Sequence, residues 1–266
     1  MSATPPDARP PREIAEAVET LGVAKANLSS LSLFTLAVFA GAFISMSALF
    51  FLVVTTNTGL GFGPTRVLGG VAFSLGLILV VVAGAELFTG NNLIAMAWAS
   101  RLVGTRAVLR NWAIVYIGNV VGCLGTVALV ALANLAALDQ GGVGITAIKV
   151  ASTKAALPLG EAFARGVLCN ALVCLAVWLT IGGRSVTDKI LAVIFPITAF
   201  VAIGLEHSIA NWFFLPYGML LAGSETISAA AAVQNLAIVT LGNIVGGTLL
   251  VASVYWLAYL RGPRQR

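Results

Sequence analysis

Charged side chains are scarce in this sequence. Asp, Glu, Lys and Arg make up only 9% of the 266 residues, and 59% are hydrophobic, whereas a soluble domain typically has about 25% charged residues. This shortage excludes an ordinary water-soluble globular protein. The formal net charge is +5, but the basic residues are scattered along the chain and form no single patch, so we expect no nucleic-acid partner.

Residues that ligate metals or attack substrates are also few. The chain has one histidine and three cysteines, which are His207, Cys123, Cys169 and Cys174. The cysteines fall inside apolar runs, where a thiol behaves as a small buried hydrophobe. No disulfide framework, metal-ligand spacing or phosphate-binding loop is present. A membrane-embedded enzyme needs a metal cluster, a nucleophile with its base or a cofactor motif, so we expect no metal, no cofactor and no enzyme activity.

Long apolar runs take the place of charge. Runs without charge, each close to or longer than the roughly 20 residues that cross a bilayer as a helix, are residues 31–56, 111–138, 166–183 and 226–260. Two further stretches, 67–100 and 190–224, are too long for one helix, and a single acid interrupts each, Glu86 or Glu206. The sequence predicts an all-α membrane protein with six transmembrane helices, the second and fifth of them discontinuous.

The N-terminal segment, residues 1–28, is polar and Pro-rich. It lacks the apolar core of a secretory signal, so we expect it to remain on the protein as a cytoplasmic segment. Ile14, Val18 and Leu21 recur at helical spacing opposite charged residues that include Glu19, which predicts an amphipathic helix. A surface anchor and a cover for a pore mouth both fit such a helix.

Basic residues indicate the orientation of the six-helix domain, residues 29–261. With six crossings both termini share one side, and eleven basic residues gather there: Arg9, Arg12, Lys25, Arg101, Arg106, Arg110, Arg184, Lys189, Arg261, Arg264 and Arg266. The other side has four, which are Arg66, Lys149, Lys154 and Arg165. The positive-inside rule therefore places both termini, including a tail at 262–266, in the cytoplasm.

Two blocks of sequence recur in the same order. Residues 84–91 (GAELFTGN) match residues 204–211 (GLEHSIAN) in Gly, Glu and Asn at an offset of 120 positions. Residues 111–122 (NWAIVYIGNVVG) match residues 235–246 (NLAIVTLGNIVG) at an offset of 124. Two matched blocks in the same order indicate an internal repeat.

Each half of this repeat, about 29–138 and about 160–261, holds three spans. Because three is odd, the second half enters the membrane from the opposite face, and the repeat is inverted. Breaks at corresponding positions of inverted halves point to a substrate path at mid-membrane. A break frees backbone N–H groups, which favour an anion together with the positive end of the helix dipole. We therefore predict a path for small anions.

The two breaks differ in the side chains that they present. His207 occupies the second break, where an ionisable group by default marks an ion path or proton relay; a neutral histidine bound to a backbone carbonyl is the structural alternative. Its counterpart is Leu87. A carboxylate repels an anion, so we expect the acids to turn away from the path and bind the freed N–H groups. The predicted structural residues of the breaks are Glu86, Glu206, Asn91 and Asn211.

Small residues four positions apart let helices approach closely. Such pairs are Gly118 with Gly122 and Gly242 with Gly246. We expect them to form helix-packing seams, with Asn119 and Asn243 hydrogen-bonded across the seams.

The motifs resemble the formate–nitrite transporter family from about residue 28 to 261. Residues 84–89 (GAELFT), 204–211 (GLEHSIAN) and 242–247 (GNIVGG) are similar to the signatures of its second, fifth and sixth helices. The resemblance implies an aquaporin-like inverted 3+3 repeat of six helices per protomer. It also implies a homopentamer in the lipid bilayer of a bacterial or archaeal plasma (inner) membrane, with a conduction path through each protomer.

The resemblance also implies roles for residues that spacing leaves open. It implies a hydrophobic constriction of Phe73, Leu77, Leu87 and Phe200. Thr89 and His207 match the central polar pair, although a threonine there is equally able to bond back to its own helix. Lys154, sixteen residues before Asn170, matches a vestibule lysine that attracts anions and helps to protonate them. The implied transport-path residues are His207, Thr89, Lys154 and Asn170.

The choice of anion stays open. Residues 182–185 (GGRS) and 209–216 (IANWFFLP) are most like formate channels, whereas residues 86–90 (ELFTG) resemble nitrite channels. We expect formate, with nitrite or hydrosulfide as the alternative. A neutral-solute, aquaporin-like channel shares the repeat and the breaks, but it normally carries Asn-Pro-Ala at both breaks, and this sequence has none.

The variant His207→Asn separates two mechanisms. Stripping water from an unpaired anion is costly, so either His207 donates a proton and the neutral acid crosses, or a charged His207 and the half-helix dipoles pass the bare anion. With proton donation, flux falls steeply as pH rises, and His207→Asn abolishes acid uptake and alters anion current. Liposome flux at two pH values measures this, and an unchanged pH dependence in the variant contradicts the proton relay.

Overall fold

The computed structural model describes residues 8–222 and 227–261. The first seven residues of the predicted N-terminal segment and the predicted tail at 262–266 lie outside the described residues. In chain order the helices are α1 (Pro11–Ala26), α2 (Ser30–Thr55), α3 (Phe62–Leu79) with its π-helical extension η1 (Val80–Gly84), the 3-10 helix η2 (Gly90–Ile94), α4 (Ala95–Ala99), α5 (Thr105–Leu132), the 3-10 helix η3 (Leu135–Ala137), α6 (Gly142–Ala155), α7 (Leu159–Gly182), α8 (Val186–Ile203), α9 (Ser208–Ala222), α10 (Ala229–Val245), the π-helix η4 (Gly246–Ala252) and α11 (Ser253–Tyr259).

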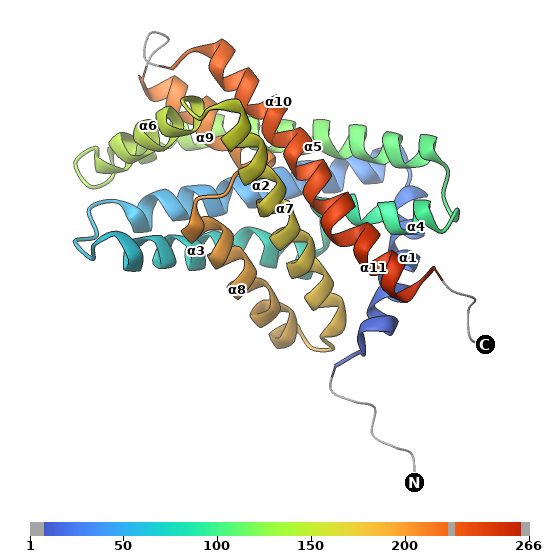
Figure 1. The fold of residues 1–266 in the computed structure, drawn as a ribbon. Coiled ribbons are helices and arrows are strands. Elements are labelled where there is room, and N and C mark those ends of the chain that lie inside the picture. Colours follow the sequence, from blue (N-terminus) through green and yellow to red (C-terminus); the bar gives the residue numbers. More distant parts are fainter. Residues whose placement is uncertain (1–7, 223–226, 262–266) are drawn as a thin grey trace.

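Six helices in the described part are long and apolar enough to cross a membrane, which confirms the predicted number. They are Ser30–Thr55, Phe62–Gly84, Thr105–Leu132, Leu159–Gly182, Val186–Ile203 and Ala229–Tyr259. The spans cross one another in a bundle, with α3 and α8 side by side (Figure 1). α1 precedes the first span, and the residues between the spans form short turns, the 3-10 helices η2 and η3, and the helices α4, α6 and α9.

The second and fifth spans are discontinuous, as predicted. The first break separates η1 from η2, and the second separates α8 from α9. Gly84 (φ +81°) and Gly204 (φ +87°) turn the chain at the two breaks. Both adopt the left-handed backbone conformation, in which a side chain with a Cβ is strained. This explains why both copies of the motif begin with glycine.

The two halves of the chain pack in the same way. α2 packs along α5, and α7 packs along α10. α1 lies on η2 and α4 after the first break, as α6 lies on α9 after the second. The equivalence therefore includes α1 and α6, which the predicted repeat boundaries leave out.

The N-terminal helix α1 is amphipathic, as predicted. Ile14 and Val18 are buried in a cluster with Trp178 of α7. Two details of the predicted stripe are wrong, because Glu19 is only 5% exposed and Leu21 is 44% exposed. A surface anchor does not account for this helix, since its buried face contacts the protein itself.

The predicted glycine seams are confirmed. A Cβ at Gly122 would collide with the carbonyl oxygen of Val38 in α2, and one at Gly246 with the carbonyl oxygen of Val167 in α7. Backbones this close leave no room for any side chain. The seams therefore fix how α5 packs on α2 and how the last span packs on α7.

Gly122→Ala is expected to destabilise the protein by about 1–3 kcal/mol, because the methyl group overpacks a backbone contact. Gly125→Ala on the same helix is the control, since a Cβ there meets nothing within 4 Å and alanine favours a helix. The fraction of protein that stays folded in detergent after heating measures both. Equal heat resistance of the two variants would contradict the seam.

Candidate transport path

Two cavities reach the breaks from opposite ends of α2. One, of about 830 Å³, is lined by Leu36 near the start of α2 and by residues 84–87 of the first break. The other, of about 390 Å³, is lined by Phe51 near the end of α2 and by residues 204–207 of the second break. We call them the first-break vestibule and the second-break vestibule.

An apolar partition separates the two vestibules. It encloses a cavity of only about 10 Å³, lined by Ile44, Phe73, Leu77, Leu87, Val173, Ile197, Phe200 and His207. Phe73 and Phe200 also face the second-break vestibule, where their rings meet edge to face at 5.7 Å. Leu77 and Leu87 face the first-break vestibule. The four residues of the predicted constriction thus form two apolar layers, one on each side of the small cavity.

The predicted polar pair meets between these layers. The Oγ1 of Thr89 lies 3.0 Å from the Nε2 of His207, and the backbone N–H of Ala210 donates to the Nδ1 of His207 at 3.1 Å. Since Nδ1 accepts, the proton of the neutral imidazole is assigned to Nε2, which donates to Thr89. The alternatives of a histidine bound to a carbonyl and a threonine bonded back to its helix are wrong.

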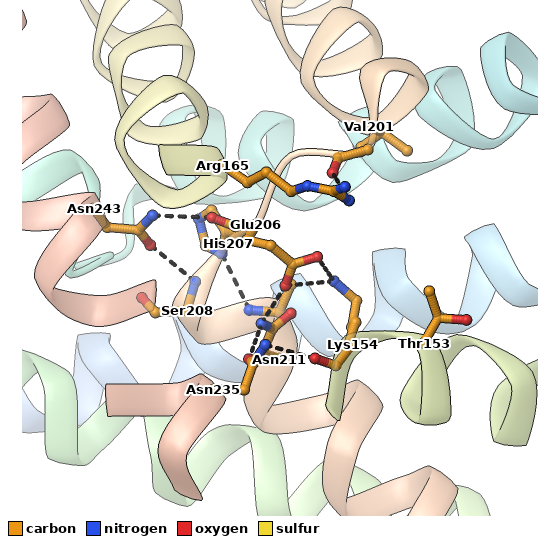
Figure 2. A network of polar contacts seen from close by, with 12 residues as sticks. Thr153, Lys154, Arg165, Val201, Glu206, His207, Ser208, Asn211, Asn235 and Asn243 are labelled. Carbon is orange, nitrogen blue, oxygen red and sulfur yellow. Dashed lines mark hydrogen bonds and ion pairs between the residues drawn. The ribbon is translucent and has the colours of Figure 1, made fainter. Parts of the chain in front are cut away.

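Lys154 anchors the carboxylate of the second break (Figure 2). Its Nζ donates to both oxygens of Glu206, at 2.9 and 3.1 Å, and lies 5.3 Å above the ring of Phe214. Asn211 donates to the same carboxylate at 2.7 Å and to the Oδ1 of Asn235 at 2.8 Å. Asn235 completes a closed circle of hydrogen bonds by donating to the carbonyl of Lys154 at 2.8 Å. We call the four residues of this circle, Lys154, Glu206, Asn211 and Asn235, the second-break clamp.

An equivalent circle, the first-break clamp, lies at the other break. Lys25 of α1 donates to Glu86 at 2.6 Å. Asn91 donates to Glu86 at 2.7 Å and to Asn111 at 3.0 Å, and Asn111 donates to the carbonyl of Lys25 at 3.0 Å. Sequence reasoning missed Lys25. The one signal available in the sequence was that both matched blocks begin with an asparagine, Asn111 in the first and its equivalent Asn235 in the second. This indicates the same bonding pattern at the two breaks.

Two asparagines hold the broken backbone together. Asn119 accepts from the N–H of Phe88 at 2.9 Å and donates to the carbonyls of Glu86 at 2.9 Å and Ala37 at 2.7 Å. The prediction that they bond across the glycine seams is confirmed, because Ala37 belongs to α2.

Asn243 repeats this arrangement at the second break. It accepts from the N–H of Ser208 at 2.9 Å and donates to the carbonyls of Glu206 at 3.0 Å and Gly166 at 2.8 Å. The prediction that Glu86 and Glu206 bind the freed N–H groups is therefore wrong. A side-chain amide offers both a donor and an acceptor, so it spans an N–H and a C=O across the break, whereas a carboxylate only accepts.

Asn170 lies behind the path. It is fully buried and donates to the Oδ1 of Asn92 at 2.7 Å and to the carbonyl of Asn243 at 2.6 Å. It lines neither vestibule nor the small cavity. Its contacts therefore hold Asn92 and Asn243 in place and do not face the cavities.

The described residues contain no group of three or more His, Cys, Asp or Glu side chains able to hold a metal ion. The three cysteines are free and buried, as predicted. The chemistry of the path is thus that of two lysine–glutamate clamps, two apolar layers and one hydroxyl–imidazole pair.

Comparisons with known proteins agree on one family. The pattern of the formate/nitrite transporter family matches residues 12–257. The chain is 41% identical over 269 residues to the formate channel FocA of Escherichia coli (strain K12), covering 94% of each. It is similar to the structure of a pentameric formate channel with formate bound (TM-score 0.80, 38% identity, 87% of this chain and 98% of that chain). It is also similar to an FNT family ion channel (TM-score 0.85, 27% identity, 92% and 98%).

Lys154→Met is expected to destabilise the protein, because it leaves a carboxylate that is only 5% exposed without its cation. Breaking a buried pair by removing one partner costs about 3–5 kcal/mol. Lys154→Met/Glu206→Gln should recover most of this loss, since the remaining amide carries no charge. Thermal unfolding in detergent measures both variants.

Lys25→Met is the matched control from the first-break clamp. The side chain of Lys25 is 31% exposed and that of Lys154 is 14% exposed. Water therefore screens the first-break pair more, and the loss should be smaller. A Lys154→Met variant as stable as the unchanged protein would contradict a buried ion pair at the second break.

Proposed function

This chain belongs to the formate/nitrite transporter family, and we propose that it is a channel for small monovalent weak-acid anions, with formate as the principal substrate. Its relatives are described as formate channels, and we propose no catalytic activity for it. The structure of a pentameric relative supports a homopentamer, in which each protomer has its own path.

The buried Thr89–His207 pair is the observation that carries this proposal. Of the residues that line the small cavity, His207 alone is polar, and it holds its Nε2–H toward Thr89. As the acceptor of this bond, Thr89 keeps its own hydroxyl proton for another acceptor. An anion that enters between the two side chains therefore meets two neutral hydrogen-bond donors. These donors offset part of the free-energy cost of removing the water from the anion.

The apolar layers on each side of this pair set the selectivity. A hydrated ion does not fit a cavity of about 10 Å³, so an anion passes only if it sheds its water or becomes neutral. The anions of small weak acids suit both routes, because they need few hydrogen-bond donors and accept a proton readily. The two lysine–glutamate clamps face the vestibules on either side, where each lysine offsets the carboxylate that would otherwise repel an anion.

The position of His207 bears on the choice between proton transfer and passage of the anion. To give up its Nε2 proton the ring must first gain a proton at Nδ1, which breaks the bond from the Ala210 N–H. Hydrogen-bond donation needs no such step. Asparagine at position 207 keeps a donor and an acceptor but carries no titratable proton, so it separates the two routes.

The distribution of basic residues supports a cytoplasmic location for both termini, and membership of the family supports a bacterial or archaeal plasma membrane. With this orientation the first-break vestibule faces the cytoplasm and the second-break vestibule faces outward. α1 forms part of the cytoplasmic vestibule wall through Thr20, Leu21 and Lys25.

Nitrite is the second candidate substrate. It is supported by residues 86–90 (ELFTG), which resemble nitrite channels and lie at the first break. This motif supplies Leu87 to the small cavity and Thr89 as the hydrogen-bond partner of His207. Hydrosulfide is a further candidate, because it is also a small monovalent weak-acid anion.

Flux into proteoliposomes tests the substrate assignment. Formate, nitrite, hydrosulfide and lactate are each supplied at two pH values, with empty liposomes as the blank. We expect formate to be fastest, and lactate slowest because of the small central cavity. Thr89→Val keeps the shape of the side chain without the hydroxyl and should reduce formate flux about tenfold, since a hydrogen bond to a charged group contributes roughly 1.5 kcal/mol or more.

If nitrite or hydrosulfide flux is faster than formate flux, that anion replaces formate as the principal substrate. Flux of none of the four anions above the blank would refute the proposed function.

A further inference from the structure

Two arginines meet the end of α8 at the second break. The Nε of Arg66, from α3, donates to the carbonyl of Ala202 at 3.0 Å, and its Nη2 donates to the carbonyl of Val201. The Nη1 of Arg165, from α7, lies 3.5 Å from the carbonyl of Gly204. Arg165 extends from α7 toward Val201, next to Glu206 and Lys154 (Figure 2). We call Arg66 and Arg165 the arginine collar.

These carbonyls matter because a broken helix has two unlike ends. The start of α9 offers free N–H groups and favours an anion, but the end of α8 presents free carbonyls and the negative end of its dipole. Val201 and Gly204 both line the second-break vestibule. An anion that approaches from this side therefore passes the unfavourable end first.

Within the described part of the chain, the first break has no such collar. The offset of 120 that relates Glu86 to Glu206 places Val186 at the position equivalent to Arg66. The position equivalent to Arg165 is Leu36, because the N–H of Glu86 donates to the Leu36 carbonyl as the N–H of Glu206 donates to the Arg165 carbonyl. Both equivalents are apolar, and no basic side chain in the described residues bonds to a carbonyl of η1.

Charge pairing in the second-break vestibule separates Arg66 and Lys149, which have no carboxylate partner in the described residues, from Lys154 and Arg165. All four basic residues that the sequence assigns to this side line it: Arg66, Lys149, Lys154 and Arg165. Glu206 holds Lys154 at 2.9 Å and Glu161 holds Arg165 at 3.0 Å. Among the described residues no carboxylate lies within ion-pair distance of Arg66. Of the two basic residues without a carboxylate partner, Arg66 is the one whose side chain bonds to the end of α8.

We propose that the arginine collar neutralises the carbonyl end of α8 and so lowers the barrier for anions between the second-break vestibule and the Phe73–Phe200 layer. Arg66 is the principal positioning residue and Arg165 assists it. The two sides of the channel are therefore unequal, since no cation from the described residues bonds to the η1 carbonyls at the first break. This inference rests on the proposed function, because it needs a conducted anion.

The kinetic consequence differs between the two sides. In a passive path the ratio of maximal rate to half-saturating concentration must be the same in both directions. A higher barrier at the second-break mouth therefore raises the half-saturating concentration for uptake from that side and leaves the maximal rate there unchanged. From the first-break side it lowers the maximal rate, and the half-saturating concentration there stays unchanged as long as the anion leaves the centre faster toward the first-break side than toward the second.

Formate uptake into right-side-out and inverted membrane vesicles that contain the full chain tests this split. For Arg66→Gln we expect about a fivefold change in each affected constant, because a cation at a helix end contributes roughly 1 kcal/mol. Arg66→Gln/Arg165→Gln should show a larger change. Arg66→Lys should show a smaller one, since an ammonium group keeps the charge but lacks the planar fork.

Lys149→Gln is the matched control, because it removes the same charge from the same vestibule and Lys149 makes no side-chain bond to α8. Its effect should vanish at an ionic strength of about 1 M, where exposed charges are screened within about 3 Å. The Arg66→Gln effect should persist there.

Three results would contradict the proposals made for this channel. Equal effects of Arg66→Gln and Lys149→Gln, both erased by salt, would overturn the collar in favour of general charge attraction. Unchanged constants in Arg66→Gln vesicles, with normal formate flux, would also overturn it. No formate flux in the unchanged protein would refute the proposed function itself. Size-exclusion chromatography of each purified variant distinguishes a misfolded protein from a slow one.

Discussion

A helix that stops inside a membrane leaves backbone groups without water, and the rest of this structure depends on satisfying them. Asn119 and Asn243 satisfy part of them, because at each break one amide accepts from a backbone N–H and donates to the carbonyl two residues earlier in the chain. The same amides reach α2 and α7 across the glycine seams. The close helix packing and the open ends of the broken helices are thus parts of one arrangement.

The lysine–glutamate clamps add a second layer to this support. Each places a buried carboxylate beside the break, and a carboxylate there would repel an anion without its lysine. The clamps explain why α1 belongs to the transport domain, since it delivers Lys25 as α6 delivers Lys154. A helix that the composition marks as a polar extension completes the wall of the first-break vestibule.

Chemistry is concentrated where the two repeats differ. The symmetric residues, Gly, Glu and Asn, build the breaks, whereas Leu87 and His207 occupy equivalent positions and present unlike surfaces to the small cavity. Arg66 and its apolar equivalent Val186 extend this difference to the vestibules. A duplicated scaffold thus carries a path whose two ends are chemically unequal.

The sequence by itself determined the six spans and both breaks, because hydropathy and the repeated motif are local signals that survive without coordinates. The Thr89–His207 pair came only from the resemblance to a known family. The sequence did not determine the partners of the glutamates, the role of Lys25 or the place of Asn170 behind the path. Those depend on contacts between residues far apart in the chain, such as Lys25 with Glu86 and Asn170 with Asn243. Only tertiary packing decides which of several possible hydrogen-bond donors reaches a buried acceptor, since each hydrogen bond forms only when the packed helices bring donor and acceptor to the right distance and angle.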